Sequence, residues 1–249
     1  MTQAEIKFDK YEKKGAYHWS EIEGSLGQLN AYTLGRYALA VDCLRAAGVP
    51  RVARVADIGC GDGALAGLLS RKLDVDVVGI DPSVAAIGHA RAEFSRRGWR
   101  GEFVVGDAYA TGLADASFDA AISADVIEHV RHPDRLLAEA RRILKPGGVL
   151  VVTTPQRVSE RPFDPLHAQE WFPEEFAQMC AAHFGPVEAH RQTHPVFWYE
   201  LYRWAGGRFG WLVRLAINAA AVRGSNPFLW SRPVWSLHTQ QAVVLRKPR

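Results

Sequence analysis

Three aspartates in the first half of the chain stand where acids hold a nucleotide-like ligand. Asp57 ends an apolar run and precedes a loop with alternating glycines, Gly59 to Gly63, which leads into a helical pattern. Asp81 ends the next apolar run, and Asp107 follows the third. Glycines let the backbone approach a ligand closely, and backbone N–H groups at the start of a helix can bind it. An acid after the second strand can accept hydrogen bonds from the ribose hydroxyls of an adenosine group.

Two cofactors compete for this loop. Gly59, Gly61 and Ala64 also match the loose dinucleotide form G-x-G-x-x-A. The charge of Asp57, however, would repel a pyrophosphate and suits a cationic ligand. Asp107 stands where an acid can accept from an adenine amino group, and nothing later in the sequence is typical of a nicotinamide-binding second half. The acids and glycines together therefore predict a cationic adenosyl cofactor rather than NAD.

The elements that must position these residues alternate between strand and helix. Apolar runs predict strands at 54–58, 75–80, 102–105, 118–123, 149–153 and, as the terminal strand, 241–245, with a weaker one at 187–191. Helical spacing predicts helices at 34–47, 64–72, 83–97, 134–144 and 172–183, and Ser83 is the expected N-cap of the third. The alternation predicts an α/β fold with a mostly parallel sheet and helices on both faces.

Length and composition limit the organisation of the chain. Its 249 residues, 48% of them hydrophobic, suffice for one large α/β domain and are few for two. We expect residues 1–50 to form a helical leader or lid and 51–249 to form the cofactor-binding domain. The cysteines, which form no CxxC pair, favour a reducing compartment without a disulfide or zinc framework. The sequence has neither a secretory signal nor a long uncharged apolar run, so we expect a cytoplasmic protein.

Five motifs between residues 50 and 155 together resemble those of class I S-adenosylmethionine-dependent methyltransferases of the small-molecule and glycan type (types 11 and 23). They are Asp57–Gly63, Asp81–Ser83, Gly106–Ala108, Phe118–His129 and Leu144–Gly148. The resemblance implies a Rossmann-like sheet of seven strands with the last strand antiparallel. It also implies S-adenosylmethionine as the cofactor.

The resemblance assigns cofactor-binding roles as well. Asp57 and the glycines would lie near the methionine part, Asp81 on the ribose and Asp107 on the adenine. Arg36 in the leader is the candidate for holding the cofactor carboxylate, and the alternative is a solvated helix charge. The full expected set is Asp57, Gly59, Cys60, Gly61, Gly63, Asp81, Pro82, Asp107, Ala108, Ser123 and Arg36.

A group of acids and histidines follows the 118–123 strand, at the strand end where ligands bind in parallel sheets. It contains Asp125, Glu128, His129 and His132. Methyl transfer from a sulfonium is an in-line displacement, and a base is needed only when the acceptor is a weakly acidic hydroxyl. Histidine can take such a proton near neutral pH. We predict Glu128 and His129 as catalytic, the alternative being that they brace the following helix.

A second group, His167 to Phe172, follows the fifth strand, where a loop normally covers the substrate. Together with Asp125, Glu128 and His129, it resembles the metal-binding set of small-RNA 2′-O-methyltransferases. Such a metal would orient and acidify a hydroxyl. Metal-free relatives that methylate quinones and sugars also carry Glu-His followed by a distant histidine. We therefore expect no metal and add His167 to the catalytic candidates, and a metal-dependent enzyme remains the alternative.

Aromatic residues outside these motifs are expected to meet the acceptor. The predicted substrate residues are Tyr17, His18, Trp19, His132 and Trp171. The leader aromatics could stack on a ring or shield the sulfonium, or they could form a packed N-terminal arm.

The segment 195–237 carries five of the eight tryptophans and five arginines against one acid, Glu200. This composition favours a substrate lid, a contact with a membrane surface, or a homodimer interface.

Taken together, the sequence predicts methyl transfer to a hydroxyl of a small-molecule, sugar or lipid-linked acceptor, with His129 or His167 as the base. Less favoured acceptor atoms are nitrogen and carbon. A nucleic-acid partner is not expected, because the net charge is only +3 and the basic excess is local. The alternatives are the metal-dependent 2′-O-methyltransferase-like enzyme and a non-catalytic S-adenosylmethionine-binding module that acts through 195–237.

Overall fold

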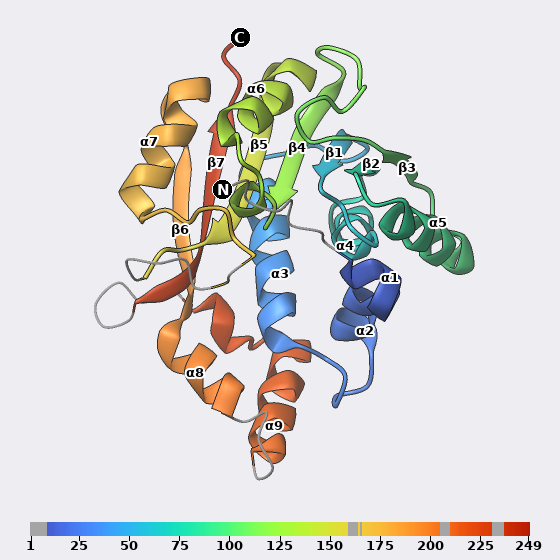
Figure 1. Cartoon of the computed structure of the whole chain (residues 1–249), viewed down its shortest axis with the longest axis vertical. Helices are drawn as coiled ribbons and strands as arrows, with labels where there is room; N and C mark the ends of the chain where they lie inside the picture. Colours follow the sequence, from blue (N-terminus) through green and yellow to red (C-terminus); the bar gives the residue numbers. More distant parts are fainter. Residues whose placement is uncertain (1–8, 159–163, 165, 205–209, 231–236) are drawn as a thin grey trace, which may run out of the picture.

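A seven-stranded sheet with helices on both faces forms the body of the molecule (Figure 1). The computed structural model describes residues 9–158, 164, 166–204, 210–230 and 237–249. The strands are β1 (Arg54–Ile58), β2 (Asp76–Asp81), β3 (Glu102–Val105), β4 (Phe118–Ala124), β5 (Leu144–Pro155), β6 (Ala189–Pro195) and β7 (His238–Arg246). Their order is β3-β2-β1-β4-β5-β7-β6. Neighbours from β3 to β5 are parallel, and β7 is antiparallel to β5 and β6, which confirms the predicted Rossmann-like sheet.

Helices cover both faces of this sheet because its strands are apolar on both sides. They are α1 (Lys10–Lys14), α2 (Tyr17–Glu23), α3 (Ala31–Ala46), α4 (Ala64–Leu73), α5 (Val84–Arg97), α6 (Pro133–Ile143), α7 (Pro173–Phe184), α8 (Val196–Trp204) and α9 (Trp211–Val222), with short 3-10 turns η1 (Ile127–His129) and η2 (Pro227–Leu229). One face packs on α3, α4 and α5 through Leu39, Leu69 and Phe94. The other packs on α6 and α7 through Leu137 and Phe176.

Polar caps decide where two of these helices begin. Ser83 accepts a hydrogen bond from the Ala86 backbone N–H (3.1 Å), so α5 begins where the sequence predicted it. Asn30 accepts from the N–H groups of Tyr32 and Thr33, and α3 therefore begins three residues before the predicted start at 34.

The strand β5 is also longer than predicted. The sequence predicts a strand that begins at 149, but the preceding stretch Leu144–Gly148 already belongs to it, and Leu144 pairs with Phe118. Lys145 Nζ lies 2.6 Å from Asp119 Oδ1, which holds the start of β5 beside β4. The proline and glycines in this stretch favour a turn, and the pairing with β4 overrides that preference.

The helices α8 and α9 project from the sheet at the end of the molecule opposite the C-terminus (Figure 1). Buried polar contacts fix them to the start of α3. Asn218 on α9 donates to the carbonyls of Leu26 and Leu29 (both 2.8 Å), and it accepts from the Tyr202 hydroxyl of α8 (2.7 Å). Within the described part of the chain, no helix combines the length and apolarity needed to cross a bilayer. Arg208, Arg232 and Trp235 of the 195–237 segment lie outside the described residues.

Candidate active site

A cavity of about 760 Å³ opens at the carboxyl ends of β1, β2 and β4, and the leader helices form part of its wall. This is the edge at which parallel sheets bind ligands. The lining includes eight of the predicted cofactor residues, namely Arg36, Asp57, Gly59, Cys60, Asp81, Pro82, Asp107 and Ala108. It also includes the predicted Tyr17, His18, Glu128, His129 and His167. The structure does not bring Gly61, Gly63, Ser123, Trp19, His132 or Trp171 to the cavity wall.

The glycines shape the loop in different ways. Gly59 has a positive φ of 81°, and a Cβ added there would lie 2.3 Å from a Val126 methyl group. Gly61 is covered by an aromatic residue of the leader, because a Cβ at this position would meet the Tyr11 hydroxyl at 2.1 Å. Gly63 is the left-handed residue that precedes α4. Gly59 therefore lines the cavity, while Gly61 and Gly63 let the loop close behind it.

Asp81 links the glycine loop to the end of β2. Its two carboxylate oxygens accept from the backbone N–H groups of Gly61 and Ser83, each at 2.9 Å. Burial raises the pKa of Asp81, and these two N–H groups oppose the rise. Asp107, at the end of β3, is exposed at the cavity rim, and it accepts from the Tyr109 N–H (2.8 Å). The two acids thus stand at successive strand ends, as the spacing predicted.

Asp57 is buried deeply on the cavity wall. Its side chain is 1% exposed, and among the described residues its Oδ2 atom has no hydrogen-bond partner. Burial raises the pKa of Asp57 to about 7, and the nearby Asp81 charge adds to this. A buried carboxylate without a partner is costly, so the site fits a ligand that brings a positive charge. The amino group of S-adenosylmethionine meets that requirement.

Arg36 offers the opposite charge on the same cavity. Its Nη1 atom lies 3.0 Å from Asp125 Oδ2, and its guanidinium stacks over the Tyr32 ring. Its Nε atom is buried and has no hydrogen-bond partner within the described chain. A carboxylate in the cavity could share this guanidinium with Asp125. Asp57 and Arg36 together therefore match the zwitterionic end of S-adenosylmethionine.

Ser123 lies inside the sheet rather than on the cavity. It pairs with Val152 of β5, its side chain is fully buried, and its hydroxyl oxygen has no hydrogen-bond partner in the described residues.

A cluster of three titratable side chains forms another part of the cavity wall. One ligand-type atom from each of Glu128, His129 and His167 lies within 4.8 Å of the others. Two segments distant in sequence supply them, η1 after β4 and the loop after β5. The Glu128 carbonyl accepts from the Ala168 N–H (2.7 Å), which fastens the loop to η1. The imidazole rings of His129 and His167 meet edge to face, with centroids 5.0 Å apart.

Hydrogen bonds define which nitrogen of each histidine can act as a base. His129 Nδ1 lies 3.0 Å from the Leu166 carbonyl, which can only accept, so Nδ1 carries the hydrogen. His167 Nδ1 lies 2.5 Å from Glu170 Oε1, a buried carboxylate. In the neutral form of both rings, Nε2 therefore holds the lone pair. Burial lowers the pKa of His129.

Glu170 is a functional candidate that the sequence analysis did not assign. Its signal was present in the spacing His167-x-x-Glu170. A carboxylate on the far nitrogen of a histidine fixes the tautomer and stabilises the charged ring. Glu128, by contrast, is 1% exposed and accepts from the Thr154 hydroxyl (3.0 Å). Burial, with Asp125 as the second cause, raises the pKa of Glu128 well above its usual range.

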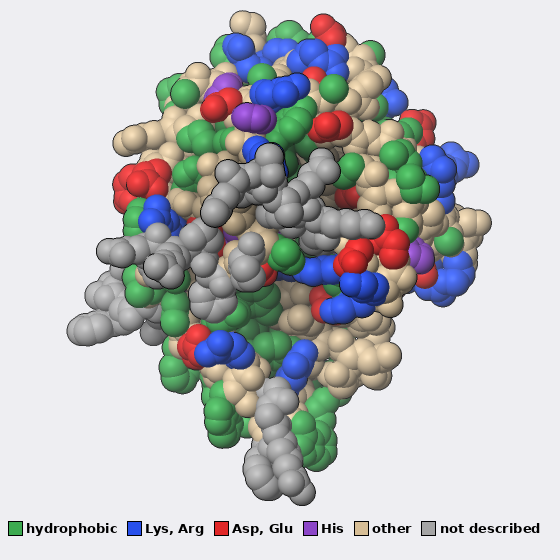
Figure 2. Space-filling model, viewed as in Figure 1, with side chains coloured by type: hydrophobic (Ala, Val, Ile, Leu, Met, Phe, Trp, Pro, Cys, Tyr) green, Lys and Arg blue, Asp and Glu red, His purple; other side chains and the backbone are tan. Residues whose placement is uncertain are grey.

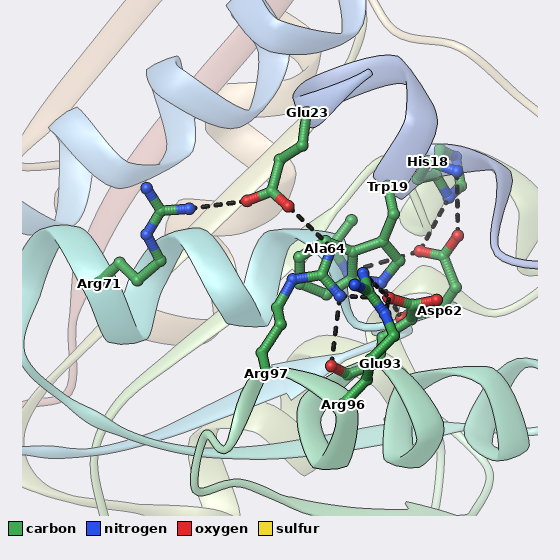
Figure 3. A network of polar contacts seen from close by, with 9 residues as sticks. All are labelled: His18, Trp19, Glu23, Asp62, Ala64, Arg71, Glu93, Arg96 and Arg97. Atoms are coloured by element: carbon green, nitrogen blue, oxygen red, sulfur yellow. Dashed lines mark hydrogen bonds and ion pairs between the residues drawn. The ribbon is translucent and has the colours of Figure 1, made fainter. Parts of the chain in front are cut away.

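The leader aromatics divide into two groups. Tyr17 and His18 line the cavity, and the His18 N–H donates to Asp62 Oδ2 (3.0 Å). Trp19 is 4% exposed and donates from its indole nitrogen to the Asp62 carbonyl (2.7 Å). Figure 3 shows the indole of Trp19 beside Arg97, whose guanidinium lies 3.7 Å from the ring centroid. Trp19 is therefore part of a packed N-terminal arm, which was the alternative to a role in stacking on the acceptor.

Two other predicted substrate residues lie in structural positions. His132 is the exposed residue that precedes α6, and its N–H donates to the Tyr109 hydroxyl (3.1 Å). Trp171 packs on Phe176 of α7, and its carbonyl accepts from the Gln241 side chain (3.0 Å). Neither residue lines the cavity, and both make contacts in the structure that surrounds it.

Comparison with known proteins agrees with this geometry. The family model described as a methyltransferase domain matches residues 56–152. A probable S-adenosylmethionine-dependent methyltransferase of Mycolicibacterium smegmatis is 34% identical over 121 residues, 47% of this chain and 45% of that protein. A ubiquinone biosynthesis O-methyltransferase of Roseobacter denitrificans is 34% identical over 157 residues, 61% and 59% of the two chains.

The fold has counterparts among solved structures as well. The structure of the [4+2]-cyclase SpnF superposes with a TM-score of 0.62 at 25% identity, covering 85% of this chain and 81% of that one. The chain spans about half the length of the curated relatives that it matches. Motifs, cavity and matches together identify residues 56–152 as a class I S-adenosylmethionine-dependent methyltransferase domain, whose cofactor is S-adenosylmethionine.

Proposed function

We propose that the protein methylates a hydroxyl group of a small-molecule, sugar or lipid-linked acceptor. The observation that carries this proposal is the His167–Glu170 pair, which offers an oriented base on the wall of the cofactor cavity. A hydroxyl is only weakly acidic, so a base that takes its proton during methyl transfer supports an oxygen acceptor.

Charged side chains at one end of the cavity would bind the cofactor. Asp57 would hold the amino group, Arg36 the carboxylate, Asp81 the ribose and Asp107 the adenine edge. When bound, S-adenosylmethionine supplies a methyl group on a positively charged sulfur and leaves as S-adenosylhomocysteine. The rings of Tyr11 and Tyr17 also line this cavity and would help to exclude water.

The base that the contacts favour is His167. Nε2 of His167 would take the proton of the acceptor hydroxyl, and the Glu170 carboxylate would stabilise the imidazolium that forms. His129 is the other candidate, but its Nδ1 bonds to a neutral carbonyl and burial lowers its pKa. We assign His129 to positioning the acceptor or His167. Several relatives named as ubiquinone biosynthesis O-methyltransferases support an oxygen acceptor.

A metal-assisted version of the same reaction is the second candidate. It is favoured by the approach of Glu128, His129 and His167, which offer one carboxylate and two imidazoles to a divalent ion. Asp125, the fourth residue of the set that the sequence suggested, is engaged by Arg36, Gln240 and Thr153. A metal site would therefore use three protein ligands or displace Arg36 from Asp125.

An acceptor screen tests the proposal. Protein purified without a His-tag is incubated with phenols, catechols, sugars, lipid-linked sugars and amines, and S-adenosylhomocysteine release is measured with and without chelator. We expect release with at least one hydroxyl acceptor, and full activity in chelator would remove the metal-assisted version. Release with amines alone would contradict the proposal. Cofactor binding without release from any acceptor would favour the non-catalytic module, and formation of a new product without release would favour a cyclase-like chemistry.

A further inference from the structure

The end of the molecule formed by α8, α9 and η2 carries exposed apolar side chains that the proposed chemistry does not use. Of the twelve large hydrophobic residues that are exposed in the described structure, seven lie between 196 and 237. These are Phe197, Trp204, Trp211, Leu212, Val222, Trp230 and Leu237. Figure 2 shows hydrophobic side chains gathered at the lower end of the molecule, over α8 and α9. We call this surface the apolar end.

Basic side chains are interleaved with the apolar ones. The described parts of α8 and α9 and their ends carry Arg203, Arg214 and Arg223 against a single acid, Glu200. Glu200 pairs with Arg203 (3.0 Å), which leaves a net positive charge on the surface. Lys or Arg side chains are visible among the hydrophobic ones at this end in Figure 2.

A small cavity lies between the start of α3 and the helices α8 and α9. Its volume is about 280 Å³, and its lining consists of Asn30, Tyr32, Tyr199, Tyr202, Arg203 and Arg214. Arg214 stacks over the Tyr202 ring at 4.7 Å, and its Nε atom is buried without a hydrogen-bond partner in the described residues. A buried guanidinium nitrogen that lacks an acceptor suits an anionic group such as a phosphate.

The apolar end could contact either a second copy of the chain or a membrane, and its charge distinguishes these two partners. A second copy in a twofold dimer would place the same patch against itself, and each patch has three arginines against one glutamate. The cores of such interfaces are depleted of charge. A bilayer with anionic headgroups is complementary instead, because tryptophan and arginine side chains both favour the headgroup zone.

We propose that the apolar end docks on an anionic membrane surface, with Trp204, Trp211 and Leu212 entering the headgroup region. Arg214 and its tyrosine-lined cavity would bind a lipid phosphate. The cofactor cavity belongs to other elements, so docking would hold the enzyme at the bilayer while the cofactor site stays separate.

Vesicle co-sedimentation of the full chain tests this proposal. The probes are vesicles of phosphatidylcholine alone and of phosphatidylcholine with about 30% phosphatidylglycerol. We expect binding to the anionic vesicles that weakens as salt is raised. The double variant Trp204→Ser/Trp211→Ser should bind about tenfold more weakly or worse. Arg214→Gln should bind about fivefold more weakly, as for the loss of one basic contact.

Matched controls keep the outcome clear. Val105→Ser removes an exposed apolar side chain on β3, and Arg51→Gln removes an exposed arginine before β1; both should bind vesicles as the wild type does. Unchanged circular dichroism and cofactor affinity would show that the variants fold, and cofactor affinity also reports on the proposed function separately. Absence of vesicle binding by the wild type at low salt would overturn the proposal. So would a dimer in sedimentation velocity that the double tryptophan variant dissociates.

Discussion

The cofactor half of the cavity and its acceptor half are built in different ways. Asp57, Asp81 and Asp107 each stand at or just after the end of one parallel strand, and β1, β2 and β3 are neighbours in the sheet. Glu128, His129 and His167 come together only because the loop after β5 folds back onto η1. The first half depends on the order of strands in the sheet, and the second on a small set of long-range hydrogen bonds between the loop and η1. Under the proposed function, the sheet would position the residues that bind the donor, whereas the loop after β5 would supply the base for the acceptor.

Replacing His167 should give the largest effect of these predictions, and the effect should be confined to the acceptor half of the cavity. His167→Ala removes the oriented base, so we expect turnover to fall by about 10²–10⁴-fold with cofactor affinity unchanged. Steady-state kinetics and calorimetry measure the two quantities. His183→Ala, which removes a histidine of α7 that pairs with Asp134 (3.0 Å), is the control and should keep full turnover. Equal turnover in the His167 variant would make that residue structural.

Replacing Asp81 should break the cofactor half instead. Asp81→Ala removes the acceptor for the N–H groups of Gly61 and Ser83 and, under the proposed assignment, the acceptor for the ribose hydroxyls. We expect cofactor binding to weaken by about 1–3 kcal/mol and the melting temperature to fall. Asp76→Ala, at the exposed start of the same strand, should change neither. If cofactor affinity survives the loss of Asp81, the ribose is held elsewhere.

Replacing Glu170 should also affect the acceptor half of the cavity, but with a smaller loss of turnover than replacing His167. Glu170→Gln keeps a hydrogen-bond acceptor near His167 Nδ1 but removes the charge that stabilises the imidazolium. We expect turnover to drop by about tenfold and the acidic limb of its pH profile to move to lower pH. The pH dependence of kcat is the readout, because a merely structural residue would not move it. Glu174→Gln, on the exposed side of α7, should leave the profile in place.

Asp57 should make the stability of the cofactor-free protein depend on pH. Burial raises its pKa from 3.8 to about 7 on folding, so the folded protein holds a proton that the unfolded chain has lost between these values. Stability from this group is therefore present below about pH 4 and decreases as pH rises toward 7, by at most about 1.4 kcal/mol per pH unit. Chemical denaturation from pH 5 to 7 should show this slope in the wild type. A slope unchanged in Asp57→Asn would assign it to other groups.

The parts that the sequence predicted are those with local causes. Ser83 caps α5 through its own hydroxyl, and the strand 102–105 lies between two glycines, Gly101 and Gly106. Both elements were therefore predicted at the correct positions. Asp57, Asp81 and Asp107 stand at the ends of apolar runs. Because the carboxyl ends of parallel strands meet at one edge of the sheet, the three acids lie on the same cavity.

The parts that the sequence did not predict depend on partners far along the chain. Trp19 resembles an acceptor-stacking residue in isolation, but Asp62 and Arg97 hold it in the core. Tyr11 gains its place from the missing side chain of Gly61. Asn218 ties α9 to the residues before α3 across more than half of the chain. A periodic pattern carries no information about such contacts.

Proton release on cofactor binding tests the central claim most directly. Calorimetric titration of S-adenosylmethionine at pH 6, in two buffers with different ionisation enthalpies, counts the protons that leave the protein. Asp57 is mostly protonated in the free protein at this pH, and a cationic ligand beside it would expel that proton. We expect one binding site with release of about one proton in the wild type and almost none in Asp57→Asn. Binding without proton release in the wild type, or no binding at all, would contradict the account.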